Sequence, residues 1–355
     1  MQQAIDFLGS IKETDNIIVI FHNDADGCCS CALIDKFLKA RIGKKSDYII
    51  SQPMPPAKNL ISKIKLSMPT KIIFLDLGVD QNPSLIKKLE NLCDILVIDH
   101  HQIMNNLNSE KTVHYNPMFR KHVYQSASYL TYKICSNMTD MRNHMWIAIV
   151  GMIGDYNVAD SMDLVHEAKK MFPELITSTE QEALHKSAFG QMADMISAAK
   201  ASKISCEEIV RNIESMESIG DMQKSEAMVS AYQSVQGEIE RILLDARSRV
   251  NAGNTVIFYE ISSKYNVHSP VSTLLSKEYP KKLIVVWETI GNKIKVSARN
   301  QSKSINVGKA LREAIRDIRH ASAGGHEAAG GVSLKKEDWD EFRERLVSLV
   351  DQKRM

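Results

Sequence analysis

Histidine and aspartate residues gather in four short motifs in the first half of the chain. In chain order the motifs are His22-Asn23-Asp24-Ala25-Asp26-Gly27, Asp76-Leu77-Gly78, Asp99-His100-His101 and Gly154-Asp155. Their five carboxylates would repel one another strongly if they met without a counter-ion, and a pair of divalent metal ions is the simplest neutralising partner. The residue types therefore favour a dinuclear metallohydrolase.

Each motif closely follows a short apolar run that is typical of a buried parallel strand. The runs are residues 17–21, 71–75, 95–98 and 147–153, and the last of them could instead be the end of a helix. Loops at the carboxyl ends of parallel strands converge on one crevice, so the motifs have a physical reason to meet there.

The motifs differ in how specifically they indicate a metal site. In an extended segment, alternate side chains point the same way, so His22, Asp24 and Asp26 can face one metal pair. The alternative is an ordinary Asp-Gly turn with capping aspartates, and an isolated Asp76 would most often cap a helix. Consecutive Asp99, His100 and His101 have no ordinary packing explanation, and Mn²⁺ accepts carboxylate and imidazole together.

Strands and helices alternate from residue 16 to about 155, which predicts a doubly wound parallel α/β sheet. Residues 161–250 are poor in Pro and Gly and predict several helices, the last from about 225 to 250. A smaller α/β pattern follows, with strands at 255–260, 283–288 and 293–299 and helices at 269–278, 305–319 and 336–350. The predicted organisation is a catalytic domain at 1–185, a helical linker at 186–250 and an accessory domain at 251–355.

Composition excludes a membrane-spanning protein and indicates a cytoplasmic one. No apolar stretch approaches the roughly 20 residues that cross a bilayer, and the N-terminus lacks a signal-peptide pattern. The six cysteines are scattered, and Cys28, Cys29 and Cys31 lack zinc-site spacing, so buried thiols are predicted there over a disulfide or a sulfur-ligated metal, in a reducing compartment. Residues 251–355 carry 18 Lys and Arg against 12 Asp and Glu, which suits a phosphate-bearing partner or is a solvated basic face.

The order and spacing of the four motifs resemble the DHH phosphoesterase superfamily, and most closely its RecJ-like nucleases. Three further segments carry the resemblance: Asn116-Pro117 with Ser126-Ala127-Ser128 between the third and fourth motifs, and Ser297-Ala298-Arg299-Asn300 and Gly324-Gly325-His326-Glu327 in the region of the accessory domain. The first motif has the compact His-x-Asp-x-Asp form, and Asn300 stands where the family often has a second serine.

The resemblance implies roles for individual residues. The implied metal ligands are His22, Asp24, Asp26, Asp76, His100 and Asp155, with Asp76 bridging two ions. His101 is expected to bind the scissile phosphate or protonate the leaving oxygen, and Asp99 to orient a neighbouring histidine. The residues expected to bind a substrate phosphate in the accessory domain are Arg299, Gly324, Gly325 and His326.

The implied activity is that of a phosphodiesterase that uses two Mn²⁺ ions, with Mg²⁺ as the alternative ion. A RecJ-like exonuclease would hydrolyse single-stranded or short DNA or RNA with water activated by the metal pair. Two alternatives stay open: a nanoRNase or cyclic-dinucleotide phosphodiesterase, and a weakly active partner of replication or repair proteins. The expected partners are oligonucleotides, with a repair protein or a second copy of the chain as further candidates and no membrane.

Overall fold

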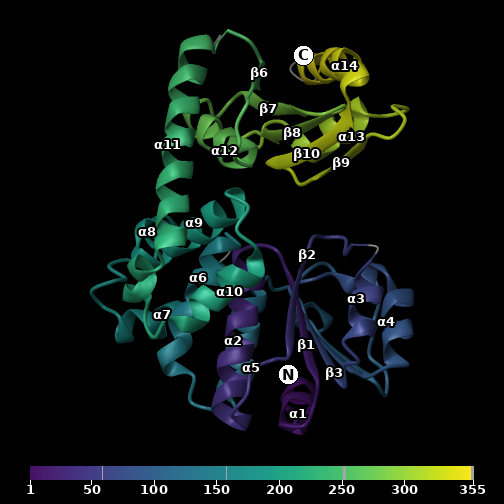
Figure 1. Cartoon of the computed structure of the whole chain (residues 1–355). Coiled ribbons are helices and arrows are strands. Elements are labelled where there is room, and N and C mark those ends of the chain that lie inside the picture. The colour runs from purple at the N-terminus through teal and green to yellow at the C-terminus, as the bar shows by residue number, and fades with distance from the viewer. Residues whose placement is uncertain (58, 157, 251–252, 353–355) are drawn as a thin grey trace. The chain divides into compact units, whose positions relative to one another are not determined.

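The computed structural model describes residues 1–57, 59–156, 158–250 and 253–352. The chain divides into two compact units, Met1–Tyr232 and Gln233–Met355 (Figure 1). Among the helices described, none is long and apolar enough to cross a membrane. All six cysteines are free and buried, among them Cys28, Cys29 and Cys31, for which this was predicted.

Unit 1 is built on a five-stranded parallel sheet. Its strands lie in the order β2 (Tyr48–Gln52), β1 (Ile17–His22), β3 (Lys71–Leu75), β4 (Asp94–Ile98) and β5 (Thr112–Tyr115). In a sheet with the order 2-1-3-4-5 the chain reverses its winding between the first and third strands, and loops open a crevice there. The predicted α/β class and the first three predicted strands are confirmed, and motifs one to three follow β1, β3 and β4.

Helices cover both faces of this sheet, because alternate side chains of each strand point to opposite sides. Val19 and Phe21 pack with α1 (Gln2–Ser10), α2 (Ala25–Ile42), α5 (Ala127–Ser136) and α6 (Met145–Gly154). Ile18 and Ile20 pack with α3 (Leu60–Leu66) and α4 (Pro83–Glu90). The sheet is therefore doubly wound, and the face that carries α2, α5 and α6 has the larger core.

The prediction of a strand at residues 147–153 is wrong, and its helical alternative is right. This segment forms most of α6, in which every residue from Met145 to Ile153 is buried. A helix that is surrounded on all sides loses its polar face, so its sequence resembles a buried strand. Asp155 caps the end of this helix and still lies with Asp26 of the first motif and His100 of the third.

The segment after the fourth motif is helical, as predicted. Its helices are α7 (Met162–Met171), α8 (Gln181–Lys186), α9 (Ala188–Ala201), α10 (Cys206–Ser215) and α11 (Glu226–Arg249). Phe189 and Met192 of α9 and Ile209 of α10 join the core of unit 1. The division into catalytic domain, linker and accessory domain stays a proposal.

Unit 2 is a smaller α/β domain with a mixed sheet, which confirms the predicted class. Its strands lie in the order β6 (Val256–Glu260), β7 (Leu283–Ile290), β8 (Lys293–Arg299), β10 (Ala329–Lys335) and β9 (Ser322–Gly325). Its helices are α12 (His268–Glu278), α13 (Val307–Ala314) and α14 (Trp339–Gln352). The helix predicted for 305–319 stops early, and Asp317 and His320 turn the chain with φ of 66° and 64°.

A buried pair of carboxyl groups, Asp35 of α2 and Glu214 of α10, joins two helices of unit 1. Asp35 is 3% exposed and accepts a hydrogen bond from the backbone N–H of Ser46 at 2.9 Å, while Lys45 pairs with Glu214. Burial and the neighbouring carboxylate of Glu214 raise the pKa of Asp35 to about 8. Asp35 therefore keeps a proton in the folded protein at a pH where the unfolded chain has lost it.

We expect Asp35→Asn to stabilise the protein more at pH 8 than at pH 5. Because the folded pKa lies above the ordinary carboxyl value, wild-type stability falls as pH rises towards about 8, by at most about 1.4 kcal/mol per pH unit. An amide at this position does not ionise and can still accept from Ser46. Thermal melts of both proteins in EDTA measure the difference in stability between them. The control is Asp140→Asn, at an exposed carboxylate paired with Arg142. A difference in stability that is constant with pH would contradict the raised pKa of Asp35.

Candidate metal centre

The first motif lies in the tight connection from β1 to α2. Asp24 caps α2 by accepting a hydrogen bond from the N–H of Gly27 at 3.0 Å. A Cβ atom on Gly27 would lie 2.1 Å from the carbonyl oxygen of His22, so only glycine permits this turn. His22 at the end of the strand and Asp24 at the start of the helix are thereby brought to 2.6 Å, measured from Nδ1 to Oδ2.

Asp26 is fixed by contacts with α5 and α6. Its carboxylate accepts hydrogen bonds from the N–H groups of Ala127 at 2.7 Å and Ser128 at 2.9 Å, at the start of α5. A Cβ atom on Gly151 of α6 would lie 2.3 Å from Ser128 Oγ and 3.0 Å from Asp26 Oδ1. The glycine lets α6 approach closely, which fixes Asp26 at the centre of the site.

Asp76 lies between two histidines, His22 at the end of β1 and His100 in the loop after β4. Its Oδ1 is 3.0 Å from His100 Nε2, and its Oδ2 is 3.4 Å from His22 Nδ1. The residue directly follows β3 and has φ of 59°, a left-handed conformation that aspartate tolerates better than most residues. This turn aims the carboxylate across the end of the sheet, which is the geometry a bridging ligand needs.

His100 and Asp155 face each other across a gap. His100 Nδ1 lies 3.7 Å from Asp155 Oδ2, and within the described part of the chain both buried atoms have no hydrogen-bond partner. The hydroxyl of Tyr124 donates to the other oxygen of Asp155 at 3.4 Å. A neutral His100 that donates from Nε2 to Asp76 presents the Nδ1 lone pair to this gap, which suits a cation.

Three groups of side chains have ligand atoms within 4.8 Å of one another and could each hold an ion. The groups are His22 with Asp24 and Asp76, Asp76 with His100 and His101, and Asp26 with His100 and Asp155. Asp76 belongs to two of them and so does His100. The donor set of carboxylate oxygens and imidazole nitrogens suits Mn²⁺ and related ions, so the residues fit a metal pair.

The charges of the site favour cations. Burial and the neighbouring carboxylates of Asp24 and Asp26 raise the pKa of Asp76 well above its usual range. Burial and the charge of Asp26 raise the pKa of Asp155 to about 8. Burial opposes the charge of His22, but Asp24 and Asp76 outweigh it and raise its pKa to about 10. Bound protons thus neutralise part of the negative charge of these neighbouring carboxylates, and metal ions would replace the protons.

Asp99 and His101 form a separate pair at the edge of the site. Asp99 is 1% exposed, and its Oδ1 lies 2.7 Å from His101 Nδ1. Burial opposes its charge, but the hydrogen bond to His101 holds the pKa of Asp99 below its ordinary value. Burial likewise opposes the charged form of His101, and Asp99 outweighs it and raises the pKa of His101. Asn116 donates to the carbonyl of His101 at 2.9 Å and fixes its backbone.

In unit 2 the predicted phosphate-binding residues lie at one end of the sheet. Arg299 ends β8, where its guanidinium donates to Ser269 Oγ at 3.0 Å and Thr273 Oγ1 at 3.2 Å. Across β10, exposed Gly324 and Gly325 form the edge strand β9, and the N–H of exposed His326 donates to the carbonyl of Ala329 at 2.8 Å. Asn300 is fully buried and holds the backbone of Lys282 and Ile305, so it supports the fold here.

Close packing also depends on glycines in and beside the hairpin formed by β9 and β10. Gly325 has φ of 145°, and a Cβ atom on Gly308 of α13 would lie 2.5 Å from the carbonyl oxygen of Gly325. The first N–H groups of α13 donate to the carbonyls of Glu327 and His326. Neither β9 nor β10 was predicted from the sequence, and Ser322–Gly325 lacks the β-branched residues that indicate a strand.

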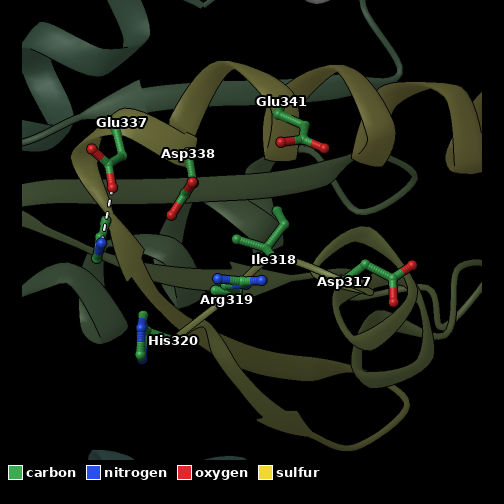
Figure 2. A pocket seen from close by; sticks show the side chains of 8 residues that line it. Asp317, Ile318, Arg319, His320, Glu337, Asp338 and Glu341 are labelled. Carbon is green, nitrogen blue, oxygen red and sulfur yellow. Dashed lines mark hydrogen bonds and ion pairs between the residues drawn. The ribbon is translucent and has the colours of Figure 1, made fainter.

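Unit 2 also has a hollow of about 440 Å³ away from these residues (Figure 2). It is lined by Asp317, Ile318, Arg319, His320, Lys335, Glu337, Asp338 and Glu341. Acidic and basic side chains mix here, and Lys335 pairs with Glu337 at 2.9 Å. Within the described residues it contains no group with metal-ligand spacing, so the chemistry is assigned to the motifs of unit 1.

Two family models match the chain: the N-terminal domain of the DHH family at residues 16–154 and the DHHA1 domain at residues 253–352. No curated protein matches it. An exonuclease RecJ bound to manganese has a TM-score of 0.71 at 17% identity, over 99% of this chain and 94% of that chain. RecJ from Thermus thermophilus in complex with Mn²⁺ has a TM-score of 0.76 at 17% identity, over 99% of this chain and 54% of that chain.

A third solved structure is a pGpG-specific phosphodiesterase from Vibrio, with a TM-score of 0.54 at 14% identity, over 95% of this chain and 99% of that chain. This chain spans about half of the Thermus RecJ chain. At these identities the solved structures show a common fold, and the two family models agree with the resemblance of the motifs. The chain belongs to the DHH superfamily, with a DHH domain followed by a C-terminal DHHA1 domain, and it shares the fold of RecJ.

Proposed function

We propose that this chain is a phosphodiesterase that depends on divalent metal ions and hydrolyses single-stranded or short DNA or RNA as a RecJ-like exonuclease. The observation that carries the proposal is the set of three overlapping ligand groups joined through Asp76 and His100. A protein without catalytic metals would have no reason to crowd these carboxylates together, since their mutual repulsion raises pKa values and costs stability.

The chain's own residues divide the work between two metal positions. His22, Asp24 and Asp76 would hold one ion, and Asp26, Asp76, His100 and Asp155 the other. When bound, such a pair supplies a Lewis acid for the phosphoryl oxygens and an activated water at neutral pH. The backbone of α5 fixes Asp26 and the hydroxyl of Tyr124 steadies Asp155, so these ligands are oriented by the groups behind them.

His101 is our candidate for the group that protonates the leaving oxygen. Asp99 holds Nδ1 at 2.7 Å, which leaves Nε2 as the proton donor to a substrate. The raised pKa of His101 keeps that proton available near neutral pH. Its side chain is one third exposed, unlike His100, so a substrate can reach it.

The likeness to structures described as RecJ bound to manganese supports an exonuclease that uses Mn²⁺, with Mg²⁺ as the alternative. The basic excess of residues 251–355 supports a nucleic acid as the substrate. The match to a pGpG-specific phosphodiesterase, over nearly all of both chains, favours a second candidate that is limited to very short substrates.

Digestion of end-labelled DNA and RNA separates these candidates. Strands that extend from a dinucleotide to beyond the roughly 4–16 nucleotides that a single-strand-binding domain covers would be incubated with Mn²⁺, Mg²⁺ or EDTA. Stepwise shortening of long strands supports the exonuclease, and cleavage confined to the shortest strands supports the second candidate. If no strand is cleaved, both candidate functions are contradicted, and the remaining hypothesis is a weakly active partner of replication or repair proteins.

We expect Arg299→Ala to raise KM for a single-stranded oligonucleotide by about tenfold or more with little change in kcat. Loss of a charged hydrogen bond costs about 1.5–3 kcal/mol, and the phosphate it is proposed to bind lies away from the scissile bond, so uniform binding is lost. Arg316→Ala, which removes a surface pair with Glu313, is the control. His326→Ala should behave like Arg299→Ala. A fall in kcat at constant KM would place Arg299 at the reaction centre instead.

A further inference from the structure

Tyr124 lies at the candidate metal centre and contacts two of the proposed ligands at once. Its ring packs against the ring of His100 at a steep angle, with centroids 4.8 Å apart and planes at 78°. Its hydroxyl donates to Asp155 Oδ1 at 3.4 Å. His100 and Asp155 belong to the same ligand group, which Asp26 completes. The phenol therefore contacts one particular metal position.

The contacts of Tyr124 leave open the atoms that an ion needs. The hydroxyl bonds Oδ1 of Asp155, whereas Oδ2 of this carboxylate lies 3.7 Å from His100 Nδ1. Within the part of the chain that the structure describes, Asp155 Oδ2 and His100 Nδ1 are buried and have no hydrogen-bond partner. Each ligand is thus held on one side and open on the other, which is how partners behind a metal site orient its ligands.

The backbone of Tyr124 is fixed by a separate element. Its N–H donates to Asp160 Oδ2 at 2.6 Å, and the side-chain amide of Gln125 donates to the carbonyl of Asp160 at 2.8 Å. Asp160 belongs to the short 3₁₀ helix η4 (Ala159–Ser161), which follows the fourth motif. The loop that carries the phenol is therefore tied to the stretch of chain just after Asp155.

The same loop leads directly into the helix that fixes Asp26. Ser126 caps α5, and the N–H groups of Ala127 and Ser128 donate to the two carboxylate oxygens of Asp26. Residues 124–128 thus contact all three members of the ligand group, Asp26 through the backbone and the other two through one side chain. A single short segment can therefore set the geometry of this metal position.

We propose that Tyr124 is a positioning residue that orients His100 and Asp155 together and so sets the metal affinity of the position that they form with Asp26. This inference rests on the proposed two-metal function and deepens it, because Tyr124 belongs to none of the four motifs. Loss of a partner that orients a metal ligand typically costs about 10–100-fold in metal affinity. The loss should fall on one of the two metal positions.

The test is calorimetric titration of the full chain with Mn²⁺, which does not depend on activity. We expect Tyr124→Ala to weaken one of two binding steps by about 10–100-fold and to leave the other unchanged. Tyr124→Phe keeps the ring beside His100 and loses only the bond to Asp155, so its loss should be smaller. The matched control is Tyr129→Phe, which removes a hydroxyl that donates to Asp163, a carboxylate outside the three ligand groups. It should bind Mn²⁺ as the wild type does.

Two further backgrounds assign the effect to its position. In Asp155→Ala the hydroxyl has no acceptor, so the addition of Tyr124→Phe should change Mn²⁺ affinity little. In Asp24→Asn, which alters the other metal position, the full effect of Tyr124→Phe should remain. Equal losses in both backgrounds, or an equal weakening of both binding steps by Tyr124→Ala, would overturn the inference and indicate a general loss of structure.

Hydrolysis of a single strand gives a second readout. Because Tyr124 acts through the ions, the kcat of Tyr124→Phe should recover as Mn²⁺ is raised to saturation, and KM for the strand should stay as in the wild type. A deficit that persists at saturating Mn²⁺ would place Tyr124 at the substrate and overturn the positioning role.

The positioning role and the proposed activity can fail separately. If the wild type binds Mn²⁺ but cleaves no strand, the proposed activity is wrong, and the titrations still decide the role of Tyr124. If both Tyr124 variants bind Mn²⁺ as the wild type does, only the positioning role is wrong. If the wild type binds no Mn²⁺, the metal centre is wrong and the role of Tyr124 is rejected with it.

Discussion

Asp76→Asn should abolish phosphodiester hydrolysis while the protein stays folded. Asp76 lies between His22 and His100 and belongs to two of the three ligand groups, so its loss affects both metal positions. Metal ions supply several kcal/mol of transition-state stabilisation, and each 1.36 kcal/mol is a factor of ten, so kcat/KM should fall by about a thousandfold or more. Asparagine tolerates the left-handed φ of 59° at this position.

The same variant should be more stable than the wild type without metal at pH 8. The pKa of Asp76 is raised in the folded state, so the wild type loses stability as pH rises above the ordinary carboxyl range, and a neutral amide avoids this loss. Thermal melts in EDTA measure the gain. Asp94→Asn, at the opposite end of the sheet and paired with Lys71, is the matched control for both measurements. A variant that keeps more than about a tenth of the activity would contradict the bridging role.

Three of the five strands of unit 1 could be predicted, because they are short, apolar and followed by chemically distinctive residues, whereas β2 and β5 were not predicted. Residues 17–21, 71–75 and 95–98 became β1, β3 and β4 with end positions within one residue. Parallel strands end at a common edge, so the meeting of Asp24, Asp76 and His100 followed from the placement of the motifs alone. The ligand groups bring together the six predicted ligands, with His101 as an additional member.

Contacts between elements distant in sequence could not be predicted. The N–H groups of Ala127 and Ser128 hold Asp26 from about a hundred residues away, and the need for glycine at 151 appears only when α5 and α6 are packed. Tyr124 reaches Asp155 from a segment without any motif. Residues 147–153 show the same limit, because complete burial removes the periodicity that distinguishes a helix from a strand.

Binding of Mn²⁺ should release protons and strengthen steeply as pH rises. Asp155, with a pKa of about 8, and His22, with a pKa of about 10, are both largely protonated near neutral pH in the metal-free protein. An ion that binds to these groups must displace their protons, and each displaced proton makes the affinity rise about tenfold per pH unit. We therefore expect the association constant to rise by more than tenfold per unit below about pH 8, because more than one proton is displaced.

Calorimetric titrations in two buffers with different ionisation enthalpies would count the released protons directly. Asp155→Asn removes one of the protonated ligands, so its affinity should be weaker and should rise less steeply with pH than that of the wild type. Asp94→Asn should keep the full dependence, because Asp94 pairs with Lys71 at the far end of β4. Binding without proton release would contradict contact between the metal and the three ligands whose pKa values are raised, Asp76, Asp155 and His22.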